Sequence, residues 1–342
     1  MKRLQSDLLL FLVALIWGTA FAFQRSAAGT TSPLAFNGAR FLLAGLLLLP
    51  LALRSRSRDT QPAAARPPYL WAGVTGVVLF IASLLQQVGI RYTTAGNACF
   101  LTSLYVVLIP MILLGLHLGR NWSPLRALHV AINPDELPNL LTWLAVLLAA
   151  VGVYLLSGAG GTFLPGQALG DGLEVVGAIF WALHVILVGK VVRRMDVGLF
   201  MAGQFLVSGL LNLVATVSFE SFSPVSLLPA AGAILYTGVL SIGIGFTLQA
   251  AAQRHAPPAD TALILSMESV FAAVSGWILL GERIDLLQIL GCGLILGGIL
   301  LAQFNRSPRP APEAGQSLPA REDAPSHRLE SAREQTAGKA HL

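Results

Sequence analysis

The sequence contains few charged residues for its length. Asp, Glu, Lys and Arg make up 11% of its 342 residues, whereas hydrophobic residues make up 55%. A soluble domain carries about 25% charged residues, so this shortage excludes an ordinary soluble domain. The chain is long enough to be a polytopic membrane protein, because ten spans of about 20 residues need roughly 200 residues.

Cysteine is also scarce. The two cysteines, Cys99 and Cys292, both lie inside apolar runs, where a thiol acts as a small packing group. We therefore expect no disulfide, no metal site and no cofactor. The net charge of +5 could suggest a nucleic-acid partner. However, the basic residues gather in short loops between apolar runs, which is typical of membrane topology and indicates no nucleic-acid binding.

Motifs for catalysis are missing as well. The sequence contains no His-Glu-x-x-His, which would indicate a helical zinc site, and neither Gly-x-Gly-Asp nor Gly-x-Ser-x-Gly. It has no nucleotide-binding motif, so ATP should not drive the protein directly. It also has no ring of charge and no filter sequence of the kind that channels use. We therefore expect that the protein is not an enzyme, and a channel is disfavoured.

What the sequence does contain is an internal duplication. The run around Trp17 recurs around Trp181, 164 residues later, and near the end of the apolar region the offset falls to 146. Each half holds five apolar runs, and an odd number of spans inverts the second copy in the bilayer, as in many secondary transporters. Pairs that share an offset include Phe41 with Phe205, Gly45 with Gly209, Gln86 with Gln249, Ser103 with Ser266, and Gly152 with Gly298.

These runs predict an all-α polytopic membrane protein with ten transmembrane helices, arranged as two inverted five-helix repeats. Each run is long enough to cross a hydrocarbon core of about 30 Å. The expected spans are 7–24, 33–53, 69–90, 96–118, 140–157, 171–191, 197–219, 229–252, 259–280 and 286–304.

Lysine and arginine set the expected orientation. With the N-terminus in the cytoplasm, the inner loops hold twelve Lys and Arg residues and the outer loops hold three. Positive residues favour the cytoplasmic side, so we expect both termini to be cytoplasmic, in an inner or plasma membrane. The first run imitates a secretory signal peptide, but it belongs to the repeat, and we expect it to remain in the protein.

The duplication also divides the chain into parts. Residues 1–157 form the first repeat and residues 171–304 form the second. The change of offset places extra residues in the first repeat, at about 121–139, as a tolerated cytoplasmic insertion or a docking or regulatory loop. Residues 305–342 contain almost no large apolar side chains, so we expect a disordered cytoplasmic tail.

The order of several motifs resembles one known family. The runs "ALIWGTAFAFQ", "ARFLLAGLLLLPLAL" and "TTAGNACFLTSLYVVLIP" are similar to the first half of an EamA-type carrier of the drug/metabolite transporter superfamily. The runs "AIFWALHVILVGK" and "ADTALILSMESVFAAVSGWILLGE" are similar to its second half. The resemblance covers residues 7–304 without the insertion. It implies a ten-helix carrier that moves small metabolites by alternating access, often outward.

Charged side chains inside a bilayer are costly, and we expect two of them, Glu268 and Arg40, deep in the spans. Glu268 lies on a face of small and polar residues that should turn toward the protein interior. It could carry a proton, meet a cationic substrate, or form a structural hydrogen bond to a neighbouring helix. Tyr105 is related to Glu268 by the offset of 163 and should lie on the facing wall.

Arg40 lies in the second expected span, where the resemblance also implies an arginine. A structural anchor or an ion pair is the favoured interpretation, and recognition of an anionic group is the alternative. His184 lies one turn after Trp181 on the same face. It could relay protons, although a lone histidine is more often a satisfied hydrogen-bonding group.

Two repeat-equivalent pairs complete the candidate substrate-binding or coupling residues. Trp17 and Trp181 lie well inside their spans, where their rings could stack on flat or apolar substrates or simply pack the helix interface. Gln86 and Gln249 could bind polar groups of a substrate, or they could only join helices by hydrogen bonds.

Proline and glycine predict irregular helices. We expect Pro110 to interrupt the fourth span and Gly243 and Gly245 to loosen the eighth, because such breaks are tolerated beside a cavity. Gly293 and Gly297 should form a small-residue face on the tenth span, for close packing within the monomer or across a dimer.

These features predict a secondary active transporter of a small metabolite, such as an amino acid, an amine or a related amphipathic compound. We expect an exporter, with proton coupling as one option. Its partners would be the small-molecule substrate and the lipid bilayer, and it could act as a monomer or a homodimer. The alternative is a lipid or lipid-carrier flippase of the same fold, which needs a side opening toward lipid. A receptor without transport is a weaker third option.

Overall fold

The computed structural model describes residues 3–56, 68–118, 139–158, 166–192, 196–220, 223–281 and 286–304. Within these ranges the regular structure is helical throughout and contains no strand. The expected insertion, apart from its last residue, and the expected disordered tail lie outside the described residues, so both remain predictions.

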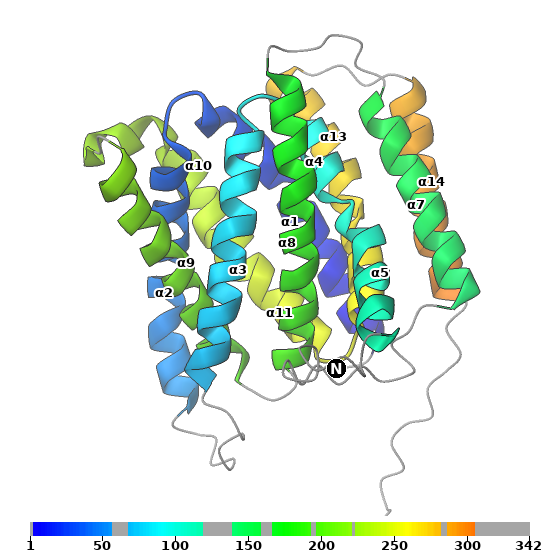
Figure 1. Cartoon of the computed structure of the whole chain (residues 1–342), viewed down its shortest axis with the longest axis horizontal. Coiled ribbons are helices and arrows are strands. Elements are labelled where there is room, and N and C mark those ends of the chain that lie inside the picture. Colours follow the sequence, from blue (N-terminus) through cyan, green and yellow to red (C-terminus); the bar gives the residue numbers. More distant parts are fainter. Residues whose placement is uncertain are drawn as a thin grey trace, which may run out of the picture. The chain divides into compact units, whose positions relative to one another are not determined.

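The first repeat contains a broken fourth span between otherwise long helices (Figure 1). Its helices are α1 (Arg3–Ala28), α2 (Pro33–Arg56), α3 (Pro68–Gly89), α4 (Ala95–Thr102), α5 (Tyr105–Leu118) and α7 (Leu140–Gly158).

The second repeat breaks its ninth span at the corresponding place and has an irregular eighth span. Its helices are α8 (Gln167–Val191), α9 (Val197–Phe219), the 3-10 turn η3 (Pro224–Ala230), α10 (Ala231–Leu235), the π-helix η4 (Tyr236–Phe246), α11 (Thr247–Gln253), α12 (Pro258–Leu265), α13 (Met267–Leu280) and α14 (Leu286–Phe304).

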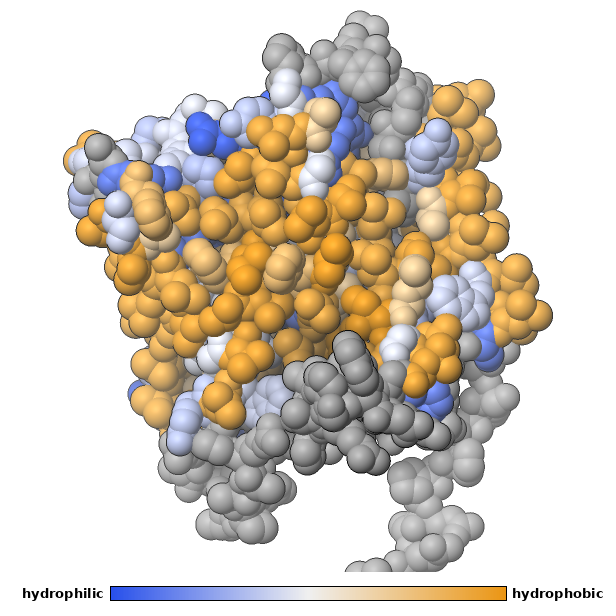
Figure 2. Space-filling model, in the orientation of Figure 1, coloured by the Kyte–Doolittle hydropathy of each residue, from blue (hydrophilic) through white to orange (hydrophobic). Residues whose placement is uncertain are grey.

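These helices make a multi-pass membrane protein. Eight segments of the described chain are long and apolar enough to cross a bilayer. Two shorter apolar helices, Leu140–Gly152 and Ile289–Gly298, occupy the fifth and tenth expected places. Large apolar side chains such as Leu46 and Val214 are about 60% exposed, and Figure 2 shows hydrophobic residues across the middle of the visible face. So large an apolar surface is unfavourable in water and favourable in contact with lipid.

Repeat-equivalent helices α2 and α9 pack against each other through a reciprocal contact. A Cβ added to Gly45 would lie 2.8 Å from the Leu206 side chain, and one added to Gly209 would lie 2.8 Å from the Leu42 side chain. The offset of 164 relates the two glycines to each other and the two leucines to each other. The residue numbers rise along one helix as they fall along the other, so the equivalent helices run in opposite directions.

Helices α7 and α14 form the second reciprocal contact and lie side by side in Figure 1. A Cβ at Gly152 would lie 2.5 Å from the carbonyl oxygen of Gly291, and one at Gly298 would lie 2.7 Å from that of Ala145. The two pairs are again related by the repeat, at the offset of 146. This pattern is what an isologous contact between two copies produces, and it fits two inverted five-helix repeats.

The close-packed glycines on α14 differ from the predicted ones. Gly291 and Gly298 face α7, whereas a Cβ at Gly293 would meet no atom within 4 Å, and one at Gly297 would lie 3.3 Å from Leu148 Cδ2. Packing of Gly293 within the monomer is therefore not found, because the helix rotation that brings Gly291 and Gly298 onto α7 turns Gly293 away from it, and packing across a dimer remains a prediction.

Candidate functional site

The site lies where the fourth and ninth spans are broken. The helix of the fourth span stops at Thr102 and resumes at Tyr105, and that of the ninth stops at Leu265 and resumes at Met267. Ser103 and Ser266 are repeat-equivalent at the offset of 163. Pro110 was expected to cause the first break, but it lies inside α5. That expectation was wrong, because a proline can remain within a helix when neighbouring groups satisfy the freed backbone.

Glu268, the second residue of α13, binds side chains of the fourth span. The Tyr105 hydroxyl donates to Oε1 of Glu268 at 2.9 Å, and the Ser103 hydroxyl donates to the same oxygen at 3.5 Å. Ser103 also shares a 2.6 Å hydrogen bond with Ser269. Tyr105 therefore faces Glu268, as the repeat offset predicts. The structural hydrogen bond that we considered for Glu268 is present, and Oε2 receives no donor from the described residues.

Aromatic rings form one wall of the site. Trp17 on α1 and Trp181 on α8 both contact Phe246 of η4, with ring centroids 4.6 Å and 6.0 Å apart. The indole N–H of Trp17 donates to the carbonyl of Ser241 at 3.0 Å. This approach depends on Gly245, where a Cβ would lie 2.7 Å from the Trp17 nitrogen. The glycine-containing stretch of the eighth span is a π-helix, which confirms that it departs from a regular α-helix.

His184 extends the aromatic wall and is fully buried. Its ring packs edge-on against Trp181 and Phe246, with centroids 6.0 Å and 5.6 Å away. Its Nε2 shares a 3.0 Å hydrogen bond with Oε1 of Gln204, while Nδ1 has no partner among the described residues. One nitrogen is therefore held in a structural bond, which is the interpretation that we favoured for a lone histidine.

The two repeat-equivalent glutamines differ in their partners. The Gln86 amide donates to the Thr102 hydroxyl at 3.2 Å, which joins α3 to α4. Gln249 is fully buried on α11, and neither its amide nitrogen nor its oxygen has a partner among the described residues. Buried polar atoms rarely stay unpaired, so Gln249 is the stronger candidate for a direct contact with a substrate or with water in the cavity.

Arg40 lies on α2 and is only 3% exposed. Its guanidinium carbon lies 5.0 Å from the centroid of the Phe36 ring and 5.3 Å from that of the Phe41 ring. Among the described residues it forms no ion pair, and its Nε has no acceptor. The ion pair that we considered is therefore not found in this part of the chain. Two cation–π contacts hold the side chain instead, which suits a structural anchor.

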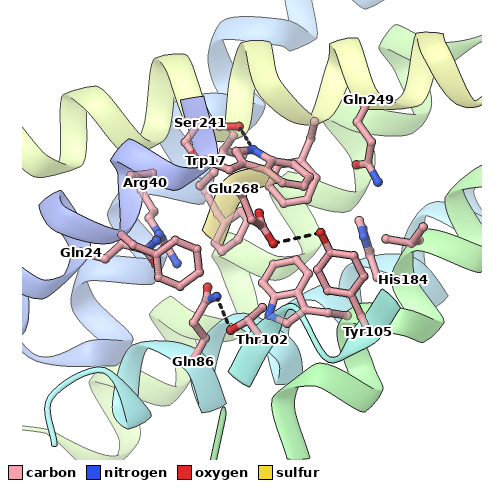
Figure 3. Close-up of a pocket in the computed structure, with 17 residues that line it drawn as sticks. Trp17, Gln24, Arg40, Gln86, Thr102, Tyr105, His184, Ser241, Gln249 and Glu268 are labelled. Atoms are coloured by element: carbon pink, nitrogen blue, oxygen red, sulfur yellow. Dashed lines mark hydrogen bonds between the residues drawn. The ribbon is translucent and has the colours of Figure 1, made fainter. Parts of the chain in front are cut away.

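All eight predicted site residues surround one cavity (Figure 3). They come from both repeats and point toward a common space. Sequence reasoning missed the side chains of Gln24, Thr102, Ser241 and Phe246. No repeat partner or charge singles these out. The lining residues are Trp17, Ala20, Phe21, Gln24, Arg40, Phe41, Gln86, Thr102, Tyr105, Trp181, His184, Val185, Ser241, Ile242, Phe246, Gln249 and Glu268.

The sequence analysis also missed a third buried ionisable residue. Glu174 on α8 is fully buried, although we expected only Arg40 and Glu268 to lie deep. We expected this span to start at 171, which would leave Glu174 near the surface. The helix instead starts at Gln167 and packs against α3 and α4. The signal that could have revealed Glu174 is the repeat itself, since residues around it match a buried part of the first span.

The cavity offers groups for binding and no cluster for metal chemistry. It combines one cation, one carboxyl group, three amides and several rings. Groups of three or more metal-ligating side chains are absent from the described residues. Polar groups on an otherwise apolar wall are typical of small-molecule sites.

Comparison with known proteins agrees with the fold. A solved protein crystal structure superposes on 89% of this chain and 98% of its own, with a TM-score of 0.66 and 19% sequence identity. At this identity the likeness shows the fold alone.

Sequence relatives are named as transporters. An uncharacterized transporter of Archaeoglobus fulgidus is 31% identical over 307 residues, which cover 89% of this chain and 87% of the relative. An S-adenosylmethionine/S-adenosylhomocysteine transporter of Chlamydia muridarum is 27% identical, over 84% of this chain and 90% of the relative. The EamA-like transporter family matches residues 4–132 and 168–304. The matches cover most of both repeats. The protein is a transporter and not an enzyme, and the chain belongs to the EamA-like transporter family.

Proposed function

We propose that this protein is a secondary carrier that exports a small amphipathic metabolite across the inner or plasma membrane. The observation that carries the proposal is the position of the cavity. It lies at the breaks of the fourth and ninth spans and takes its lining from both repeats. Secondary transporters with inverted repeats bind substrates where broken helices meet near the bilayer midplane.

The chemistry of the wall supports a substrate with a flat or apolar part and a polar part. Trp17, Trp181 and Phe246 offer rings on which a flat group can stack. Gln249 offers an unpaired amide, and Oε2 of Glu268 can accept from an ammonium or hydroxyl group. The Chlamydia relative is named for two compounds that join an amino acid to a purine ring. That name supports the class of amino acids, amines and related compounds, without choosing a member.

The reciprocal helix contacts support alternating access. Exchanging the conformations of the two repeats would close the cavity on one side and open it on the other, because inverted repeats are structurally interchangeable. The broken spans are where such a change needs little energy, since i→i−3 hydrogen bonds there replace some of the regular ones, from Leu104 N–H to the Leu101 carbonyl and from Ser269 N–H to the Ser266 carbonyl.

We propose that Glu268 takes part in coupling. Its carboxyl group contacts the opposite repeat through Tyr105 and Ser103. Protonation or a cationic substrate would change the charge at this contact, and the contact joins the two halves that must move relative to each other. An intramembrane carboxyl group is a functional candidate by default because its burial is costly.

The first experiment is untargeted profiling of small molecules inside and outside cells that overproduce the chain. Parallel cells should overproduce Glu268→Gln and, as a matched control, Glu220→Gln. Glu220 lies at the end of α9 and hydrogen-bonds Ser32 outside the cavity. We expect one compound class to accumulate outside with the intact chain and with the control, and at least tenfold less with Glu268→Gln.

The outcomes separate the parts of this proposal. An equal outward shift with Glu268→Gln would keep the carrier and reject the role of Glu268. A shift confined to lipids or lipid carriers would support the flippase instead. No shift with a chain that is present in the membrane would reject export.

A further inference from the structure

Glu174 is a buried carboxyl group behind the wall of the cavity. It is 0% exposed. Its Oε2 accepts a 3.0 Å hydrogen bond from the Thr102 hydroxyl, and Oε1 is buried with no partner among the described residues. No Lys, Arg or His of the described residues pairs with it. A carboxylate without a cation or a full set of donors is costly inside a protein, so Glu174 needs a ligand.

A polar chain joins Glu174 to the cavity. Gln86 and Thr102 both line the cavity, Gln86 donates to Thr102, and Thr102 contacts Glu174. The Thr102 hydroxyl also lies 2.8 Å from the carbonyl of Ala98. A hydroxyl carries one proton, so it can donate to only one of these two acceptors at a time.

The protons on Thr102 and Glu174 can be placed in two ways in this geometry. With the carboxylate ionised, Thr102 donates to Glu174. With the carboxyl protonated, Thr102 donates to Ala98, and the carboxylic acid donates to the oxygen of Thr102. The second arrangement adds one proton, forms one O–H bond on Glu174 and breaks one O–H bond of a hydronium ion in the cavity.

The surroundings keep other ligands away from Glu174. A Cβ at Gly89 would lie 2.8 Å from Oε1 of Glu174, so α3 approaches the carboxyl closely. The titratable neighbours are Asp171, one turn earlier on α8, and Cys99 on α4. The other described titratable or charged groups on or beside the helices packed against α8 form no interaction with Glu174. They include Tyr69 on α3, Tyr92 just after α3, Tyr105 and His117 on α5, Asp260 on α12, and Arg254 just after α11.

The duplication provides an internal comparison. The offset of 164 relates Glu174 to Leu10, and the offset of 163 relates Thr102 to Leu265. Both leucines are fully buried and belong to the same apolar cluster. In the other half of the molecule both equivalent positions are therefore buried leucines. The fold does not require a carboxyl group and a hydroxyl at this place.

We infer that Glu174 is a proton-binding site of the carrier, reached from the cavity through Gln86 and Thr102. The inference rests on the proposed transport function, to which it adds a second carboxyl group besides Glu268. The site lies on α8, which packs against α3, α4 and α5, so a proton there would act on the contact between the broken fourth span and the second repeat.

Infrared difference spectroscopy on the full chain in phosphatidylcholine vesicles tests this directly, with the proton as the only ligand. Lowering the pH should produce carbonyl-stretch bands of buried carboxylic acids. We expect Glu174→Gln to lose a band that Glu268→Gln keeps. Thr102→Val should shift that band, because it loses its hydrogen-bond partner. Thr75→Val should not shift it, since the buried Thr75 hydroxyl bonds only carbonyls of its own helix.

The double variant Glu174→Leu, Thr102→Leu copies the packing of the other repeat and serves if Glu174→Gln does not fold. It should also lose the band. Spectra of either Glu174 variant that match the intact chain at every pH would overturn the inference. So would a band that responds to sodium and not to pH. The readout does not depend on transport, so a failed export assay with an intact band would reject the proposed function alone.

Discussion

Single glycines set how closely the helices that carry the site can approach. Gly18 on α1 faces α13 at the residue that bears the coupling candidate. A Cβ at Gly18 would lie 2.5 Å from the carbonyl oxygen of Glu268 and 2.5 Å from the Cβ of Phe271. One of these atoms belongs to the backbone, so a side-chain rotation cannot relieve the contact. Any larger residue at position 18 must push the two helices apart.

We therefore predict that Gly18→Ala destabilises the protein by about 1–3 kcal/mol, as overpacking of a close contact usually does. The measurement is thermal unfolding of the purified chain in detergent. Gly172→Ala is the control, because Gly172 is exposed on α8 and a Cβ there meets no atom within 4 Å. Equal melting temperatures for the two variants would show that α1 and α13 do not pack as described.

Residue-level prediction succeeded where the repeat offset related two candidate residues to each other. Tyr105 was found as the partner of Glu268 from the offset alone, and the hydroxyl lies 2.9 Å from the carboxyl. Glu174 was missed, because its position near an expected span boundary suggested a solvent-exposed carboxyl group. The orientation of a side chain near a helix end depends on the neighbouring helices, and these are not adjacent in the sequence.

At the scale of elements, the duplication makes the α2–α9 contact nearly symmetric. Gly45 receives Leu206 and Gly209 receives Leu42 with the same 2.8 Å clearance for an added Cβ. The two halves of the contact belong to one helix–helix interface, so a change at one glycine that pushes α2 and α9 apart also relieves the other contact, and the two changes should be coupled.

We predict that Gly45→Ala and Gly209→Ala lower the stability by similar amounts, within about 0.5 kcal/mol, and that the double variant lowers it by less than the sum of the two effects. Thermal unfolding of the two single variants and the double variant tests this. Gly232→Ala on α10 is the control, because its Cβ would meet no atom within 4 Å. A large loss from only one glycine would contradict the reciprocal contact.

Helix breaks were harder to predict than helices. Proline suggested a break at Pro110, yet α5 continues through it and the span breaks at Ser103 and Leu104. The break coincides with the hydrogen bonds from Ser103 to Ser269 and Glu268. These partners lie about 165 residues away in the chain, so local propensity around Pro110 contains no information about them.

At the scale of the whole molecule, the distribution of Lys and Arg predicts both termini in the cytoplasm. A single cysteine at Gly29, between α1 and α2, should then face outward, and one at His255, between α11 and α12, should face inward. Both positions are exposed. In a background without Cys99 and Cys292, a membrane-impermeant maleimide should label Gly29→Cys in intact cells and His255→Cys only in broken ones. The reverse pattern would invert the predicted topology.

The sequence by itself determined the class of the protein, the number and places of the spans, and the inverted duplication. Low charge and long apolar runs permit little besides membrane helices, and a repeat with an odd number of spans leaves one arrangement of its copies. The sequence also determined which residues of the two repeats are equivalent, and this equivalence predicted that Tyr105 pairs with Glu268.

Only the tertiary structure decided how these parts form one site. It placed eight predicted residues from both repeats around one cavity. It left Arg40 against two rings, without an acid among the residues that the structure describes, and buried Glu174 behind Thr102. The physical reason is that burial and hydrogen bonding depend on which distant helices approach. The packing of whole helix faces sets which helices approach closely. A short stretch of sequence does not contain this information.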